Sequence, residues 1–394
     1  MERFVTRMNG MVKIGNRKIG FGYPVYIVAE LSANHGGNLD TAIRAVSLAK
    51  QAGADAIKSQ VFTRDSITIN KHIPIEAGEW TGQSYRELYE KAAMPREWNV
   101  ALADMAMRVG IDFFASVFSE EDLEWMETNI NPDVYKIASF EIVDLPLIEC
   151  VAQTGKSVIL STGMADISEI EKAIEILKRK EISFALLHCN SFYPASENDI
   201  DLGKMALLNI YDCPVGFSDH TRGIHAAIVA TALGANIIEK HFTPDEPYTL
   251  DASFSLGTMG FKSMVDAIRT TEEMLRPRLL DSNNPNLQFR PSIWVVKNVM
   301  AGQYFTEDNL KTNYGDISKF IWYNCLGLGC KSVLDVGCNS GMELSSFPNY
   351  VELTGIDRNL TALKNAREMR PHFTFKEGDV MNLDIPDNSF DMVF

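Results

Sequence analysis

Two short stretches of the sequence place ionisable side chains directly after apolar runs. In NIIEKHFT, residues 236–243, two isoleucines precede Glu239, Lys240 and His241, and in PVGFSDHT the apolar run ends at His220. Buried charge is costly unless it is paired or bound to a metal. Two imidazoles beside carboxylates, with open water positions, suit Mn²⁺ or Mg²⁺ better than a closed zinc site. A hydrogen-bonded histidine pair fits the same spacing.

Lysines and hydroxyls accompany other apolar runs. Lys58 and Lys136 each lie within such a run, and Ser161 and Ser218 lie at the ends of two more. If these runs meet in space, they form a cationic patch rich in hydrogen-bond donors, which is what a phosphate or a carboxylate needs. The alternative is that the two lysines are paired with Glu30 or Glu141.

The elements that would position these side chains alternate regularly along the chain. Amphipathic stretches such as LDTAIRAVSLAKQAGA separate eight β-rich runs, and the runs are almost continuously apolar, as parallel strands covered on both faces are. This pattern predicts an α/β fold, a parallel (β/α)₈ TIM barrel over residues 1–285, and a doubly wound open sheet fits the eightfold count less well. The eight runs are residues 25–31, 56–62, 112–118, 134–140, 157–163, 184–190, 214–220 and 236–242.

In a barrel of this kind, the carboxyl ends of the strands meet at one mouth, where the chemistry takes place. Almost every predicted strand ends in polar residues, and we expect these residues to converge. A lone His188 or Ser161 is more commonly a satisfied core group. The remaining strand-end candidates are Glu30, Gln60, Ser139, Glu141, Thr162, Ser191, Tyr193, Asp219 and Lys240.

Composition excludes several classes of partner. The chain of 394 residues has a net charge of −15, which argues against nucleic acid and against an anionic membrane surface. It has no long apolar segment and no apolar stretch of the signal-peptide kind near its start. Six cysteines without zinc-like spacing predict reduced thiols and a cytoplasmic protein.

Beyond the last barrel helix, the composition changes. PRLLDSNNPNLQFRPS reads as a linker, and a short β-like piece follows at 292–312. A different kind of segment then begins with KSVLDVGCNSG. We therefore expect three parts, namely residues 1–285, 286–313 and 314–394.

Six motifs occur in the order found in one enzyme family: AELSANHGG, GADAIKSQVF, YKIASFEIVDLPLI, LSTGM, GFSDHT and IEKHFT. Over roughly residues 15–280 the chain resembles the nonulosonic (sialic) acid synthases, and it looks most like the pseudaminic acid synthases. The resemblance implies condensation of phosphoenolpyruvate with an N-acylated amino sugar, C–O cleavage and phosphate release. It also implies a divalent metal cofactor and a homodimer.

The resemblance also implies roles for individual residues. Asn190 stands where the family usually has a threonine, so Ser191 is the aligned phosphate binder and Asn190 an alternative one. EPYTL replaces a glycine-rich turn just before Asp251. By position, His220 and His241 would bind the metal, Glu30 would assist the attacking water, Lys58, Lys136, Ser161 and Ser218 would hold phosphoenolpyruvate, Gln60, Glu141, Tyr193 and Asp251 would face the sugar, and Ser139 and Glu239 would support them.

The carboxy-terminal part resembles two other domains. Residues 286–313 look like the opening of the antifreeze-like domain that follows the barrel in the synthases and lends an arginine to the partner subunit's site. Residues 314–394 look like the first half of a class I methyltransferase, expected to be truncated and inactive. That resemblance implies S-adenosylmethionine contacts at Asp335, Gly337, Gly341, Asp357 and Asp379.

Two other functions fit the same residues. Lys58, Lys136 or Lys240 could be the buried amine of a Schiff-base aldolase. The chain could also be a non-catalytic binding module that holds phosphoenolpyruvate without turnover.

Overall fold

The computed structural model describes residues 10–76, 78–244, 249–276, 294–295, 310–311, 331–338, 351–379, 385–386 and 389–393. The chain divides into two compact units, Met1–Pro277 and Arg278–Phe394. Each unit is considered by itself. The predicted boundary after residue 285 lies outside the described residues and stays a prediction.

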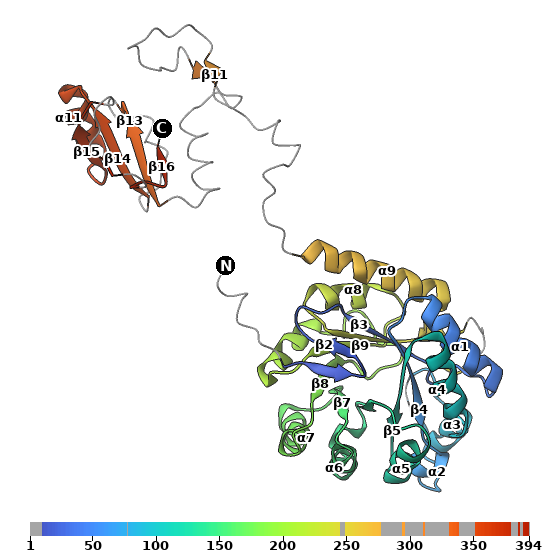
Figure 1. The fold of residues 1–394 in the computed structure, drawn as a ribbon. Helices are drawn as coiled ribbons and strands as arrows, with labels where there is room; N and C mark the ends of the chain where they lie inside the picture. Colours follow the sequence, from blue (N-terminus) through green and yellow to red (C-terminus); the bar gives the residue numbers. More distant parts are fainter. Residues whose placement is uncertain are drawn as a thin grey trace. The chain divides into compact units, whose positions relative to one another are not determined.

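Unit 1 is a closed barrel of eight parallel strands in the order β10-β3-β4-β5-β6-β7-β8-β9 (Figure 1). The predicted TIM barrel is thereby confirmed, and each of the eight predicted runs contains one strand. The strands are β3 (Tyr26–Glu30), β4 (Ala56–Val61), β5 (Asp112–Val117), β6 (Val134–Ile137), β7 (Ser157–Ser161), β8 (Phe184–Cys189), β9 (Val215–Asp219) and β10 (Ile237–His241).

Helices follow the strands around the outside of the barrel. Their local sequences explain where they begin: Asn38 accepts from the Thr41 N–H ahead of α1, and Asp166 forms a reciprocal capping box with Glu169 ahead of α7. The helices are α1 (Leu39–Gln51), α2 (Arg64–Ile67), α3 (Tyr85–Ala92), α4 (Trp98–Val109), α5 (Glu120–Asn129), α6 (Leu145–Gln153), α7 (Ile167–Arg179), α8 (His225–Ala232) and α9 (Thr258–Leu275).

One connection departs from the regular alternation. Between β8 and β9 the chain forms a 3₁₀ segment, η3 (Leu202–Tyr211), instead of an α-helix. Left-handed residues flank it, Asp201 with φ 40° and Asp212 with φ 52°.

Successive residues of each strand face opposite layers of the core. The larger apolar cluster joins the outer faces of the strands to the helices and contains Ile238, whereas a smaller cluster fills the barrel interior and contains Ile237. Because side chains alternate along a strand, Glu239 and His241 share the interior face with Ile237, and Lys240 shares the helix face with Ile238. The expectation that Lys240 lies at the mouth is therefore wrong.

An amino-terminal hairpin packs into the barrel interior. Its strands are β1 (Val12–Ile14) and β2 (Arg17–Ile19), paired antiparallel. The buried side chains of Val12, Ile14 and Ile19 belong to the interior apolar cluster, together with strand residues such as Val28 and Ile159. Figure 1 shows this hairpin in blue across the barrel. Its buried side chains are apolar, and Arg17 of β2 also pairs with Asp55 at 3.2 Å and with Asp112 at 2.9 Å, so the hairpin stabilises the barrel.

The described residues of unit 2 form two small sheets. β11 (Trp294–Val295) pairs antiparallel with β12 (Leu310–Lys311), within the segment predicted to be β-like. A parallel sheet in the order β15-β14-β13-β16 follows, with the helix α11 (Leu360–Met369). Its strands are β13 (Ser332–Val336), β14 (Glu352–Asp357), β15 (Thr374–Glu377) and β16 (Met392–Val393). This is the open parallel sheet expected of a partial Rossmann-like domain.

Within the described ranges, no helix is both long and apolar enough to cross a membrane. In the same ranges, Cys150, Cys189 and Cys213 form no disulfide.

Candidate active site

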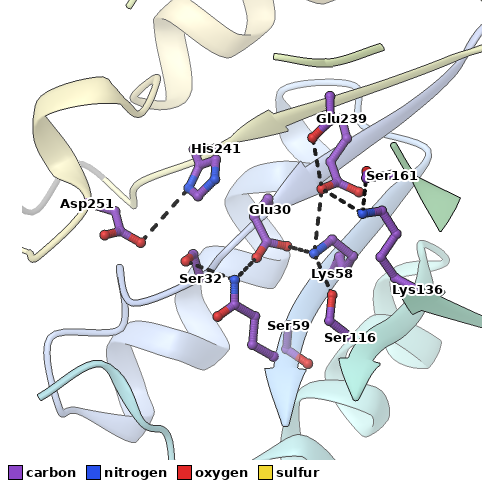
Figure 2. A network of polar contacts seen from close by, with 12 residues as sticks. Glu30, Ser32, Lys58, Ser59, Ser116, Lys136, Ser161, Glu239, His241 and Asp251 are labelled. Carbon is purple, nitrogen blue, oxygen red and sulfur yellow. Dashed lines mark hydrogen bonds and ion pairs between the residues drawn. The ribbon is translucent and has the colours of Figure 1, made fainter. Parts of the chain in front are cut away.

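A cluster of charged side chains is buried where the strands of unit 1 end. The Lys58 ammonium lies 2.6 Å from a Glu30 oxygen and 3.6 Å from Glu239 Oε1. Lys136 lies 3.8 Å from the same Glu239 oxygen and donates to Ser161 Oγ at 2.7 Å. Figure 2 shows these side chains pointing toward one another. Both the predicted lysine patch and the alternative pairing with Glu30 are therefore present.

The electrostatics of this cluster are finely balanced. Burial raises the pKa of Glu30, although Lys58 counteracts part of the shift. Burial also lowers the pKa of Lys136, with Glu239 opposing it. For Lys58, Glu239 and Glu30 outweigh burial and the net pKa rises, while for Glu239 the two lysines outweigh burial and the net pKa falls. Two cations thus face two carboxyl groups, and the net charge that an anion meets depends on whether Glu30 is protonated.

Two hydroxyls in this cluster were missed in the sequence. Ser116, the last residue but one of β5, accepts from Lys58 at 3.1 Å, and Ser32 accepts from Gln60 at 3.2 Å. Ser116 could have been found, because it lies near the end of the run 112–118, and residues near the carboxyl ends of barrel strands are candidates for the site. Ser32 adopts a left-handed backbone, with φ 45°, and no sequence pattern signalled that conformation.

The two predicted metal ligands lie side by side. The ring centroids of His220 and His241 are 5.5 Å apart, with the ring planes at 72°. Since a metal–nitrogen bond is about 2.1 Å long, rings that share one ion have centroids at most roughly 6.5 Å apart. The two imidazoles are therefore within reach of a single ion.

The hydrogen bonding of the histidines suits metal binding. His220 Nδ1 lies 2.6 Å from the Asn190 carbonyl oxygen, and because a carbonyl only accepts, this nitrogen donates its proton and leaves Nε2 as the acceptor. His241 Nδ1 is buried and has no hydrogen-bond partner among the described residues; Asp251 Oδ2 is 3.9 Å away. Burial lowers the pKa of His220 to about 4 and that of His241 well below its usual value. Both rings are neutral at pH 7, as ligands must be.

Within the described ranges, no group of three or more His, Cys, Asp or Glu side chains is arranged to hold a metal. The pair of imidazoles thus accounts for two coordination positions, and any others would be open to water or substrate. The donor set fits the predicted Mn²⁺ or Mg²⁺, whose presence stays a prediction.

A second group of hydroxyls lies near the lysines. The hydroxyls of Ser139 and Ser191 are 3.0 Å apart, and Gly163 approaches both so closely that a Cβ there would lie 2.4 Å from Ser139 Cβ and 2.7 Å from Ser191 Oγ. Ser218 donates to Glu239 Oε1 at 3.3 Å and lies 3.4 Å from His220 Nε2. The absence of a side chain at Gly163 therefore allows the Ser139 and Ser191 hydroxyls to lie this close together.

A cavity of about 690 Å³ opens onto this cluster. All four residues predicted to face the sugar line it, together with Ser191 and His241, whereas Lys58 and Lys136 lie deeper. The four are Gln60, Glu141, Tyr193 and Asp251. Burial raises the pKa of Glu141 to about 7 and that of Asp251 above its usual value. The site therefore has an inner charged part and an outer, larger part.

Some strand-end candidates turn away from the site. His188 Nε2 bonds the Ile200 carbonyl oxygen at 2.7 Å, as a satisfied core histidine does. Lys240 pairs with Asp219 at 3.0 Å, both fully buried. The side-chain amide of Asn190 donates to the Asp199 carbonyl oxygen at 2.8 Å. Asn190 therefore acts on the site through its backbone carbonyl oxygen, which accepts from His220, and not through its side chain.

The residues predicted to contact S-adenosylmethionine are only partly described. Gly337 has φ 88° and follows β13, where a glycine turn was expected. Asp335 lies within β13, and Asp357 ends β14 and accepts from the Asn359 N–H at 2.7 Å. Asp379 pairs with Arg358. Gly341 lies outside the described residues, so the ligand contacts stay predictions.

A closed parallel barrel that gathers ion-paired lysines, hydroxyls and two imidazoles at its carboxyl mouth, beside a large cavity, has the architecture of a (β/α)₈-barrel enzyme. The chain belongs to the NeuB family, whose profile matches residues 45–278. A methyltransferase-domain profile matches residues 333–394. The resemblances to the synthases and to a methyltransferase are therefore confirmed, and the resemblance to an antifreeze-like domain stays a prediction.

Curated proteins similar to this chain include the pseudaminic acid synthase of Campylobacter jejuni (strain 81-176), 39% identical over 335 residues, covering 82% of this chain and 96% of that protein. The N,N'-diacetyllegionaminic acid synthase of C. jejuni (strain NCTC 11168) is 33% identical and covers 73% and 89%. Among solved structures, the sialic acid synthetase of Leptospira borgpetersenii in complex with citrate is 34% identical, with a TM-score of 0.64, covering 71% of this chain and 95% of that one.

Proposed function

We propose that unit 1 is a nonulosonic acid synthase that condenses phosphoenolpyruvate with an N-acylated amino sugar. The family supports the reaction class, since the related proteins named above make pseudaminic, legionaminic and sialic acids. One observation carries the proposal for this chain: the buried lysines and the paired imidazoles lie at one mouth, next to a cavity of about 690 Å³.

The inner cluster suits the anionic substrate. Lys58 and Lys136 flank Glu239 Oε1 at 3.6 and 3.8 Å, and Ser161 accepts from Lys136. Phosphate and carboxylate groups bind best where charged donors and hydroxyls converge. We assign phosphoenolpyruvate to this cluster, with Ser139, Ser191 and Ser218 completing it.

His220 and His241 would hold a divalent cation, which when bound polarises a carbonyl oxygen as a Lewis acid. The outer cavity holds the sugar in its open form, so that the aldehyde carbon lies beside C3 of phosphoenolpyruvate. The C2=C3 electron pair of phosphoenolpyruvate would form a bond to the aldehyde carbon, whose oxygen takes up a proton. Water would add at C2 and lose a proton, and the adduct would then form the C2 ketone and release phosphate by cleavage of the C2–O bond. Glu30 accepts the proton from that water, for which its raised pKa suits it.

The aldolase alternative has less support. Lys240 is paired with Asp219 on the helix face, and Lys58 is paired with Glu30 at 2.6 Å. Among the three lysines, only Lys136 combines a position at the mouth with a lowered pKa, and burial is the cause of that lowering. Borohydride trapping with pyruvate would label the protein if Lys136 formed a Schiff base.

The test is phosphate release from phosphoenolpyruvate with a panel of N-acylated amino sugars, with and without Mn²⁺ and after EDTA treatment. We expect release that depends on both the sugar and the metal. The variant carrying His220→Ala and His241→Ala should lose activity by at least roughly a hundredfold. Undiminished activity of that variant without metal would show that the proposed metal-dependent mechanism is wrong. Binding of phosphoenolpyruvate without release, with every sugar, would favour the non-catalytic alternative.

A further inference from the structure

The outer cavity contains two hydrogen-bond donors to which the sequence patterns assign no role. Trp80 and Arg86 both line it, from the segment between β4 and α4. Trp80 Nε1 and Arg86 Nη1 are shielded from solvent and have no hydrogen-bond partner in the part of the chain that the structure describes. A buried donor without a partner costs free energy, so a native site that keeps one calls for an acceptor from elsewhere.

The two side chains are held in place by their other contacts. Arg86 Nη2 donates to Asp65 Oδ1 at 2.7 Å, which leaves Nη1 for the cavity. The Trp80 ring packs 5.9 Å from Tyr193 and 6.0 Å from Phe254. Both donors are therefore pre-organised, which lowers the entropic cost of binding.

The surrounding wall determines which acceptor fits. It is largely aromatic and aliphatic, with side chains such as Ile75, Leu88 and Tyr89. Its described charged residues, besides Arg86 and Lys71, are three carboxyl groups, Glu79, Glu141 and Asp251. Arg86 is already paired with Asp65, and the three carboxyl groups of the wall, when ionised, oppose the binding of an anion. A neutral acceptor carried on an apolar group is favoured.

The position of Trp80 near His241 also favours a neutral acceptor on the sugar. Tyr193 and Phe254, against which Trp80 packs, both contact the His241 ring, at 5.8 and 5.0 Å between centroids. A group bound at Trp80 therefore lies close to the carbonyl carbon that reacts beside His241. In a 2-amino sugar, the nitrogen is attached to the carbon next to that one.

We propose that Arg86 and Trp80 recognise the N-acyl substituent of the sugar: their N–H groups donate to the acyl carbonyl oxygen, and the apolar wall takes the acyl carbon chain. This inference rests on the proposed function. It makes both residues determinants of specificity for acylated over free amino sugars.

The experiment compares N-acetylmannosamine with mannosamine, and a diacetamido-trideoxyhexose with its diamine, on the full-length protein. Binding is measured by saturation-transfer NMR and turnover by phosphate release. Arg86→Met removes the guanidinium, together with its pair with Asp65, and Trp80→Phe removes the indole N–H. Arg64→Met is the matched control, because Arg64 also pairs with Asp65, at 3.3 Å, but does not line the cavity.

We expect the preference for the acylated sugar to fall roughly 10- to 100-fold in Arg86→Met and by about 2- to 10-fold in Trp80→Phe, with the KM for phosphoenolpyruvate unchanged. Saturation of the acetyl methyl protons should fall in parallel, and Arg64→Met should behave as the wild type. An unchanged preference in both variants overturns the inference, as does a wild type that binds free amines equally well. Loss of a preference for N-acetylmannosamine 6-phosphate over the unphosphorylated sugar in Arg86→Met would also overturn it, because Arg86 would then bind an anion. Sugar binding without phosphate release would contradict the proposed function. The saturation-transfer NMR measurement would then test this inference by itself.

Discussion

At the scale of single residues, the site depends on carboxyls whose pKa values burial has raised. Glu30 can accept a proton from water only when it is ionised, and burial raises its pKa to about 7. We therefore expect kcat/KM for phosphoenolpyruvate to rise with pH through neutrality, far above the value near 4.3 of an ordinary glutamate. Measurement of phosphate release from pH 5 to 9 tests this, since kcat/KM reports the free enzyme.

The same measurement on Glu30→Gln supplies the control. Its rate should be lower by roughly two to four orders of magnitude, with no rise near pH 7. The sign for stability is opposite to that for activity. Because the folded protein binds this proton more tightly than the unfolded chain, the stabilisation from Glu30 is complete below about pH 4 and lost as the pH rises through 7. A profile that is flat in the wild type would exclude Glu30 as the base.

Gly163 makes a second prediction at this scale. A Cβ at this position would lie 2.4 Å from Ser139 Cβ and 2.7 Å from Ser191 Oγ, so Gly163→Ala must displace the hydroxyls assigned to phosphoenolpyruvate. We expect its KM to rise roughly tenfold or more, because one misplaced or unpaired charge-assisted hydrogen bond costs about 1.5 kcal/mol or more. Steady-state kinetics measure the change.

Gly155→Ala is the matched control for that substitution. Gly155 also has a positive φ, 75°, but nothing lies within 4 Å of its Cβ position. Both variants carry the backbone strain of an alanine in the left-handed region, about 1–2 kcal/mol. Equal effects of the two on the KM for phosphoenolpyruvate would show that strain, and not the crowded hydroxyls, explains the result.

At the scale of elements, the strands that carry the histidines are joined behind the site. Lys240 of β10 and Asp219 of β9 form a fully buried pair at 3.0 Å, and Asp219 Oδ1 accepts from the Thr221 N–H at 2.9 Å, just after His220. Lys240→Met would leave the Asp219 charge buried without its cation. We expect a loss of about 3–5 kcal/mol in the free energy of unfolding, measured by urea denaturation.

The exposed pair of Lys262 and Asp266, at 3.1 Å, offers a comparison on α9. Lys262→Met should cost less than about 1 kcal/mol, because exposed pairs contribute little. The double variant with Lys240→Met and Asp219→Leu should recover part of the stability lost in the single variant, since no buried charge then remains. A single Lys240→Met variant as stable as Lys262→Met would show that the pair does not hold the two strands.

The elements also show what the sequence could predict. Apolar runs separated by amphipathic stretches predicted all eight strands, and the strand-end rule brought Glu30, Lys58, Lys136 and His241 together. The same reasoning placed Lys240 wrongly, because it did not consider that side chains alternate between the two faces of β10. The sequence IIEKH is sufficient to predict that alternation.

The outer wall of the cavity could not be predicted in this way. Trp80 and Arg86 lie in the segment that connects β4 to α4, where the chain folds back so that Ile75 N–H donates to the Gln83 carbonyl oxygen at 2.8 Å. No hydrophobic period marks such a fold, because its position depends on packing against residues far along the chain, such as Phe254. Ser32 escaped notice for the same reason: its left-handed backbone depends on tertiary context.

At the scale of the whole molecule, the barrel separates the candidate active site, at the carboxyl ends of its strands, from the interior apolar cluster that the amino-terminal hairpin covers. The hairpin of β1 and β2 contributes only apolar side chains to the interior cluster, and Ile14 is 2% exposed. Ile14→Ala should destabilise unit 1 by about 2–5 kcal/mol, through lost burial and the cavity left behind. Phosphate release at a temperature where the variant is folded should match the wild type, which would separate stability from catalysis.

The two compact units, Met1–Pro277 and Arg278–Phe394, give the last prediction. We propose that phosphoenolpyruvate with Mn²⁺ binds unit 1 and that S-adenosylmethionine binds unit 2. A ligand at a hundred times its Kd stabilises the folded state by about 2.7 kcal/mol, and raises the Tm of a domain of 150–250 residues by roughly 5–10 °C. Calorimetry of the full chain should then show two transitions, each raised by one ligand alone. A single transition that both ligands raise would mean that the units unfold together. If S-adenosylmethionine shifts neither transition while phosphoenolpyruvate still shifts one, unit 2 does not bind this cofactor, and the proposal for unit 1 stands unaffected.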